Sequence, residues 1–140
     1  MSIDFSYKHS ELSEAIIGVF YEVYNELGYG FLESVYRNSL KLALLAKGLR
    51  VETEVPVHVF FRGENVGDFR ADMVINGCLL LELKTADVII MAHEAQLLNY
   101  LRTTNLEVGL ILNFGPKAQV RRLAYDNTRK QFKSQRAGVS

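Results

Sequence analysis

The stretch CLLLELKTADV, residues 78–88, places two charged side chains in an apolar run. Its leucines and Cys78 are typical of a strand buried in a protein interior. Residues two apart in a strand point to the same face, so Glu82 and Lys84 lie side by side, about 7 Å apart along the backbone. Such a pair indicates either a surface ion pair on a half-exposed strand or a functional site.

Asp72 lies in the preceding predicted strand, and the turn between the two strands decides whether it faces Glu82. A strict two-residue turn at Asn76-Gly77 places the two carboxylates on opposite faces. A three-residue loop, or a bulge at Gly77, shifts the pairing by one residue and places Asp72 across from Glu82, with about 5 Å between their Cβ atoms. The sequence is compatible with both registers, and the chemistry considered next requires the second.

In the second register, two carboxylates share a buried site, which is destabilising unless a cation compensates their charge. Mg²⁺ takes oxygen ligands and usually needs only one or two carboxylates beside waters and substrate phosphates. Asp72 and Glu82 are therefore candidate ligands of Mg²⁺, with Mn²⁺ as the alternative ion. Lys84 is placed to orient or deprotonate an attacking water, or to stabilise transition-state charge. This combination indicates metal-assisted hydrolysis of a phosphodiester.

Two predicted helices carry further polar residues that fit such a site. Glu33 shares a helix face with Tyr36 and Leu40, and this face points to the core, where a carboxylate is unusual. Glu33 either accepts a hydrogen bond from a backbone amide or from Tyr36, or it is a further ligand of the metal or of a water. Gln96 and Tyr100 are i,i+4 neighbours. They form either the edge of an ordinary amphipathic helix or a contact to a phosphate or water.

The hydrophobic periodicity predicts an α/β fold with the element order α-α-β-β-β-α-β-β. A three-strand meander followed by a crossover helix and two more strands makes a mixed central β-sheet flanked by helices. Residues 1–140 form a single domain with a basic tail from about residue 127. The expected elements are a helix with Ser10 as its N-cap and Gly28 at its end, a helix over 31–47, strands over 51–61, 66–75 and 78–85, a helix over 91–104, and strands over 107–113 and 118–126.

Composition narrows the class of protein. Hydrophobic residues make up 49% and charged residues 23%, which is ordinary for a globular domain. The single cysteine excludes an internal disulfide framework and a cysteine-based zinc cluster. No apolar run approaches the ~20 residues that span a bilayer, and the N-terminus has no signal-peptide pattern. We therefore expect a cytoplasmic protein without a membrane partner.

The formal net charge is zero, but its distribution is uneven. Basic residues concentrate between residues 117 and 136, and Arg121 and Arg122 belong to this segment. Such a segment is either a solvated tail or an electrostatic footprint for nucleic-acid phosphates. In the second case Arg121 and Arg122 bind the substrate.

Glu33, Asp72, Glu82 and Lys84 together resemble the PD-(D/E)XK nuclease superfamily, whose pattern is a helix with an acid, an Asp on one strand and (D/E)xK on the next. The spacing from Gln96 to Tyr100 is similar to the QxxxY motif of its recombination-type exonuclease branch. The stretch GFLESVY, residues 30–36, matches the signature of the small bacterial GxxExxY protein family. The likeness covers roughly residues 10–125. Ala71 precedes Asp72 where the superfamily's name has a proline.

The resemblance implies a restriction-endonuclease-like core and a Mg²⁺-dependent nuclease that acts on DNA. It adds the backbone carbonyl of Leu83 to the metal ligands, beside Asp72, Glu82 and Glu33. Gln96 and Tyr100 then contact the substrate or support the site. A homodimer would supply the second active site that double-strand cleavage needs. The alternative is a nucleic-acid-binding or protein-binding module on a nuclease-like scaffold without catalysis.

Overall fold

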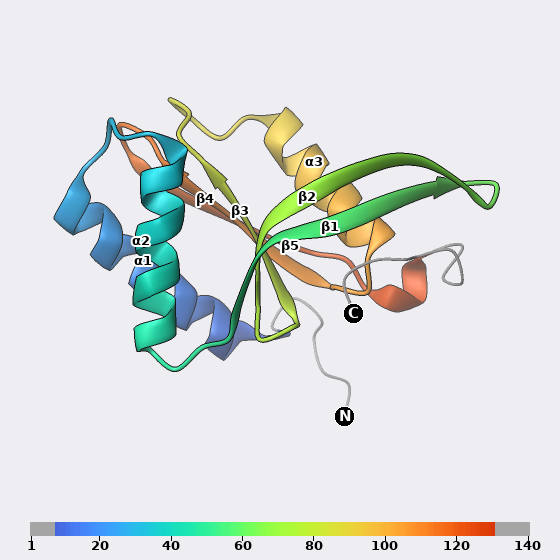
Figure 1. Cartoon of the computed structure of the whole chain (residues 1–140), viewed down its shortest axis with the longest axis horizontal. Helices are drawn as coiled ribbons and strands as arrows, with labels where there is room; N and C mark the ends of the chain where they lie inside the picture. The colour runs from blue at the N-terminus through green and yellow to red at the C-terminus, as the bar shows by residue number, and fades with distance from the viewer. Residues whose placement is uncertain (1–7, 131–140) are drawn as a thin grey trace.

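The apolar stretch around Glu82 becomes β3, Leu79–Lys84, which lies in the middle of a mixed five-stranded sheet (Figure 1). The computed structural model describes residues 8–130. The sheet order is β1-β2-β3-β4-β5, with β3 parallel to β4 and every other neighbouring pair antiparallel. The other strands are β1 Val51–Phe61, β2 Glu64–Ile75, β4 Val108–Phe114 and β5 Ala118–Ala124. The predicted α/β class, mixed sheet and element order are confirmed.

The turn between β2 and β3 has three residues, 76–78, and Ile75 pairs with Leu79 across it. This is the second of the two registers that the sequence allowed. Continued along the strands, it places Asp72 across from Glu82, on the same face of the sheet. The two carboxylates therefore meet as the metal hypothesis requires.

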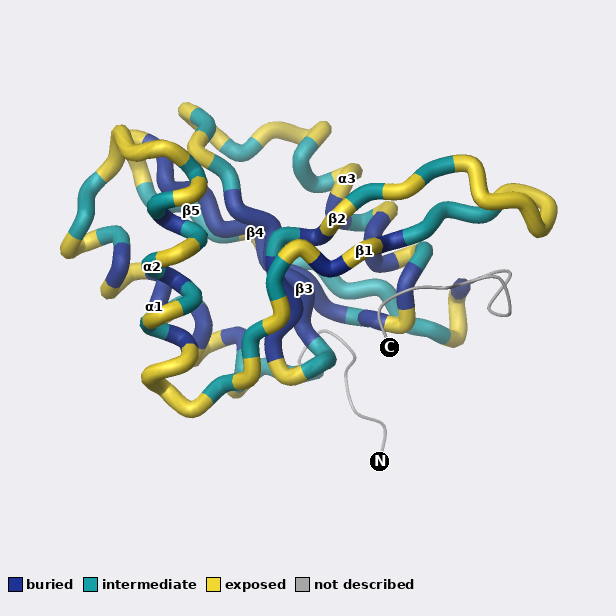
Figure 2. Tube along the Cα trace, in the orientation of Figure 1, coloured by how far each residue is buried: buried dark blue, intermediate teal, exposed yellow. Residues whose placement is uncertain are grey.

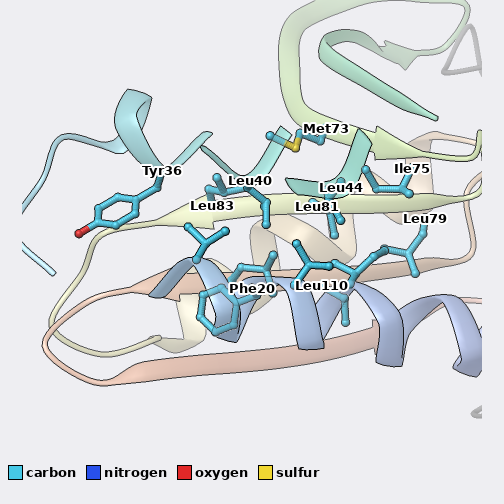
Figure 3. Close-up of a cluster of buried hydrophobic side chains, with 14 of the residues drawn as sticks. Phe20, Tyr36, Leu40, Leu44, Met73, Ile75, Leu79, Leu81, Leu83 and Leu110 are labelled. Carbon is cyan, nitrogen blue, oxygen red and sulfur yellow. The ribbon is translucent and has the colours of Figure 1, made fainter. Parts of the chain in front are cut away.

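The sheet is covered on both faces, and β3 sends side chains into both cores. Leu79, Leu81 and Leu83 pack against α1, Ser10–Leu27, and α2, Glu33–Ala46 (Figure 3). Leu80 packs on the opposite side, in the core beneath α3, Met91–Thr103. By strand alternation Glu82 and Lys84 share the face of Leu80 and of α3.

The ends of the helices lie within two residues of the predicted ends, and the N-cap of the first helix differs from the prediction. Ser10 is the first residue of α1, and His9, in a left-handed backbone conformation (φ 57°), takes the N-cap position without a side-chain hydrogen bond. Gly28 ends α1 as predicted, with its N–H donating to the carbonyl of Tyr24. Part of the predicted basic tail forms a short 3₁₀ helix, Asn127–Arg129, and residues 131–140 lie outside the described chain.

β1 and β2 continue past the body of the molecule as a hairpin arm, residues 58–69 (Figure 1). The arm is largely exposed toward its tip, whereas β3 and β4 are buried almost throughout (Figure 2). No helix within residues 8–130 is long and apolar enough to cross a membrane.

Candidate functional site

Asp72 and Glu82 meet where β2 and β3 separate. Counted from the turn, the last pair between β2 and β3 is Met73 with Leu81, next to Asp72 and Glu82. Beyond this pair, Asp72 Oδ2 accepts a hydrogen bond from the backbone N–H of Leu83, at 2.7 Å. Glu82 is only 6% exposed, and its Oε1 is buried without a hydrogen-bond partner among the described residues. Burial first, and then the charge of Asp72, raise the pKa of Glu82 to about 8, while Lys84 lowers it. The site therefore favours a proton or a cation at this carboxylate.

Three further predicted residues surround this acid pair. Lys84 Nζ donates to Gln96 Oε1 at 3.3 Å, which joins β3 to α3. The Tyr100 ring stacks on Phe69, with centroids 4.1 Å apart. Burial, followed by the charges of Glu82 and Asp72, raises the pKa of Tyr100 to about 12. Tyr100 thus keeps its phenolic proton at neutral pH and lies close enough to sense both carboxylates.

Glu33 opens α2 and reaches the acid pair through an arginine. Arg37 forms ion pairs with Glu33 Oε1 at 3.5 Å and with Asp72 Oδ1 at 3.6 Å. Burial and then Asp72 raise the pKa of Glu33, and Arg37 and Lys84 lower it. Glu33 therefore belongs to the same electrostatic cluster as Asp72.

Tyr36 does not make the hydrogen bond to Glu33 that was one of the open alternatives. Its hydroxyl donates to the carbonyl of Gly28 at 2.6 Å and accepts from the N–H of Phe31 at 3.3 Å. Its ring stacks on Phe114 at the end of β4, with centroids 4.3 Å apart. Tyr36 thereby fixes the loop that leads into α2, and with it the position of Glu33.

Two residues of this site escaped the sequence analysis. Arg37 lies four residues after Glu33, a spacing that brings the two side chains together on a helix. Asn113, buried at the end of β4, lies beside Lys84 in the parallel register. Its side chain bonds both the N–H and the carbonyl of Ala86, each at 2.9 Å, and so fixes the chain where it leaves β3. A polar residue ending an apolar strand was the available signal for Asn113.

The structure does not gather the predicted phosphate-binding residues at one surface. Arg121 and Arg122 are neighbours on β5 and point to opposite faces of the sheet. Arg121 Nε pairs with Glu94 Oε1 at 3.2 Å, whereas Arg122 Nε donates to Ser13 Oγ at 3.4 Å. Lys130 is buried, and its Nζ donates to two backbone carbonyls, at 2.7 and 2.9 Å. Contacts of Arg121 and Arg122 with phosphates stay predictions.

The donor set fits a hard cation with few protein ligands. Within residues 8–130, no group of three or more His, Cys, Asp or Glu side chains is arranged to hold a metal ion. Mg²⁺ usually needs only one or two carboxylates, completed by waters and substrate phosphates. The buried, unbonded Oε1 of Glu82 beside the Asp72 carboxylate is an oxygen that such an ion would satisfy. Glu33, paired with Arg37, suits an indirect role better than direct ligation.

Comparisons with known proteins bear on the fold and on the family of this chain. The crystal structure of SSO0001 is similar to this chain, with a TM-score of 0.54 and 23% sequence identity over 88% of this chain and 62% of that one. The chain thus spans about 62% of the length of that protein, and at this identity the likeness shows the fold alone. None of the curated proteins matches. The narrower likeness to the GxxExxY family stays a prediction. A family model described as PD-(D/E)XK nuclease superfamily matches residues 10–123, and the chain therefore belongs to that superfamily.

Proposed function

We propose that the protein is a Mg²⁺-dependent nuclease that hydrolyses phosphodiester bonds in DNA, with Mn²⁺ as a substitute ion. The observation that carries this proposal is the acid pair of Asp72 and Glu82 beside Lys84, in which Glu82 is buried and one of its oxygens is unbonded. Membership of a nuclease superfamily supports the same chemistry. Without a cation, the ionised form of Glu82 is destabilising, because this carboxylate is buried beside the charge of Asp72.

Asp72 and Glu82 would hold the ion, and the backbone carbonyl of Leu83 would offer a further oxygen. The N–H of Leu83 already binds Asp72 Oδ2, which orients the carboxylate before any ligand arrives. When bound, Mg²⁺ supplies Lewis-acid polarisation of the phosphoryl group and neutralises developing charge. Ligands held in place by such contacts need little rearrangement during the reaction.

Lys84 would act on the attacking water and on the charge that develops at the phosphate. A lysine ammonium has three N–H donors, and Gln96 Oε1 accepts one of them. This bond holds Nζ on the α3 side of the acid pair and leaves two donors for a phosphate oxygen and a water. Gln96 is thus a positioning residue for Lys84.

Arg37, Glu33 and Tyr100 would complete the site without binding the ion directly. Arg37 balances the charge of Asp72 and holds Glu33, whose carboxylate can orient a water. Tyr100 keeps its proton and can donate a hydrogen bond to a phosphate oxygen. The site thereby places donors on both sides of the acid pair.

Metal-dependent cleavage tests the proposal. Purified wild type is titrated with Mg²⁺ or Mn²⁺ against duplex DNA, single-stranded DNA and RNA, beside Lys84→Ala, Asp72→Ala and the control Glu26→Gln, an exposed acid on α1. We expect cleavage only with metal, unchanged in the control and reduced about 10²–10⁴-fold in both site variants. Cleavage that persists in both variants would come from a contaminant and would rule out the assignment.

Ion binding is measured separately by calorimetry with Mn²⁺. We expect one site in wild type and none in Asp72→Ala, whether or not a suitable substrate has been found. Ion binding without cleavage of any polymer would favour the non-catalytic module. Sedimentation of the same samples tests the expected homodimer.

A further inference from the structure

A groove with a volume of about 760 Å³ lies beside the acid pair. The hairpin arm forms one wall, α3 forms the other, and the segment from Tyr125 to Lys130 closes the far end. Its size lies within the ~300–1,000 Å³ of pockets that enclose small organic groups.

The groove shares two residues with the proposed catalytic site. Gln96, which binds Lys84, is one of its lining residues. Tyr100, whose pKa responds to Glu82 and Asp72, is another. A chain that passes the acid pair along α3 therefore enters this groove.

Aromatic side chains from three separate elements line the groove. Phe60 and Phe69 come from the arm, Tyr100 from α3, and Tyr125 from the segment after β5. Phe69 and Tyr100 already stack on each other. Aromatic rings along a groove are typical of sites where unpaired bases stack.

The charge of the lining suits a polyanion. None of the lining residues is an Asp or a Glu, and Arg102 and Arg129 lie at the far end. Their guanidinium carbons lie 5.9 and 4.6 Å from the centre of the Tyr125 ring. Within residues 8–130, neither arginine forms a salt bridge with a carboxylate. Both charges are therefore available to phosphates.

We propose that this groove binds a single-stranded segment of nucleic acid and leads it to the acid pair. The substrate is then a nucleic acid that has unpaired nucleotides beside the cleaved bond. The inference deepens the proposed function and rests on it. In a duplex the base faces are hidden in the stack, so the aromatic lining would have nothing to contact. From Gln96 to Arg102, six residue steps, α3 rises about 9 Å, which is room for about two stacked nucleotides at 3.4 Å each.

Binding is measured without metal, so that no cleavage is needed. The probes are a fluorescein-labelled dT12 and a blunt hairpin duplex of matched length, followed by fluorescence anisotropy in EDTA at several salt concentrations. The variants are Phe60→Ala, which removes a stacking ring, and the double variant Arg102→Gln/Arg129→Gln. The control is Arg70→Gln, an exposed arginine next to Phe69 on β2 that does not line the groove. Circular dichroism and thermal melting confirm that each variant is folded.

We expect wild type to bind dT12 at least about tenfold more tightly than the duplex, and each groove variant to lose about tenfold. The double variant should also lower the slope of log affinity against log salt by about 0.7 per arginine, since each contact to single-stranded phosphate contributes that amount. Arg70→Gln should stay within about twofold of wild type.

Equal binding of dT12 and duplex would overturn the inference. Groove variants that bind dT12 as tightly as Arg70→Gln does would overturn it as well. Failure of the nuclease proposal has a different signature, namely metal-independent or absent cleavage with the binding pattern intact. A duplex carrying a single-stranded overhang, incubated with Mn²⁺, separates the two further. Cuts should fall in or next to the overhang, and cuts confined to the duplex would contradict the groove assignment.

Discussion

The burial of a single residue, Glu82, is the feature that marks the candidate metal site in this fold. Apart from Glu82, all residues of β3 before Lys84 are buried leucines, and Glu82 is buried almost as deeply. A carboxylate in this position is destabilising in its charged form, because burial removes its hydration and Asp72 repels it. At neutral pH the site therefore favours a proton on Glu82, whose Oε1 has no hydrogen-bond partner among the described residues, and a bound cation would take the place of that proton.

The free energy of unfolding of the metal-free protein should depend on pH through the ionisation of Glu82. Native Glu82 keeps its proton up to its raised pKa of about 8, whereas in the unfolded chain it loses the proton near its ordinary pKa of 4.5. The native state thus binds more protons between these two values, so stability falls as pH rises through that range. Relative to Glu82→Gln, wild type should lose on the order of 3–5 kcal/mol between pH 4.5 and 8, at ~1.4 kcal/mol per tenfold change in proton affinity.

Urea unfolding in EDTA at pH 4.5, 6.5 and 8 measures this difference. Glu82→Gln should equal wild type at the lowest pH and exceed it at pH 8, and added Mg²⁺ should restore wild type at pH 8. Glu26→Gln, at an exposed position on α1, should follow wild type throughout. Parallel curves for wild type and Glu82→Gln would show that Glu82 is not a destabilising charge in the native protein.

At the scale of elements, the site depends on how the chain leaves β3. Asn113 on β4 bonds both backbone groups of Ala86, and the turn after β4 packs against the same residue. Gly115 in that turn is so close that an added Cβ would lie 2.0 Å from the carbonyl oxygen of Ala86. Strand β4 and its turn therefore position the end of β3 and, with it, Lys84.

Gly115→Ala should damage both stability and the site. Backbone must move to admit the methyl group, so we expect a loss of ~1–3 kcal/mol or more in the free energy of unfolding. Metal-dependent cleavage should fall further than stability explains, since Lys84 shifts with Ala86. Gly67→Ala on β2 is the matched control, because its Cβ would meet only Val59 at an ordinary 4.0 Å. Urea unfolding and cleavage rates measure both effects, and equal behaviour of the two variants would contradict this role of Gly115.

Elements were predictable from periodicity, but the register between β2 and β3 was not. A run of leucines buried on both faces gives no alternation, so a slip of one residue changes little in the pattern. Only the three-residue turn at 76–78 decides it. Arg37 and Asn113 escaped for a related reason, since their partners Asp72 and Ala86 lie far along the chain. Ser10 was misplaced at the cap because His9 takes a left-handed conformation that no local pattern demanded.

The whole molecule combines a deeply buried centre with an exposed arm. β3 and β4 lie between two helical layers, whereas residues 58–69 of the hairpin arm extend past the body (Figure 2). Segments with few buried contacts open locally at much lower cost than buried strands. We therefore expect one wall of the groove to belong to the least stable part of the molecule, whereas Glu82 and Lys84 lie on the buried strand β3.

Hydrogen exchange should show the difference in stability between the arm and the buried strands, and how binding of dT12 changes exchange in the arm. Backbone amides of residues 58–69 should exchange orders of magnitude faster than those of β3 and β4, because the arm opens without unfolding the core. Bound dT12 should slow exchange in the arm and along α3 and leave the α1–α2 layer unchanged, since that layer covers the opposite face of the sheet. Mass spectrometry of peptic fragments, with and without dT12 in EDTA, measures both effects. Uniform protection of arm and core would show that the arm is as stable as the centre. Protection by dT12 that is confined to the α1–α2 layer would place the nucleic acid on the face of the sheet opposite to Lys84.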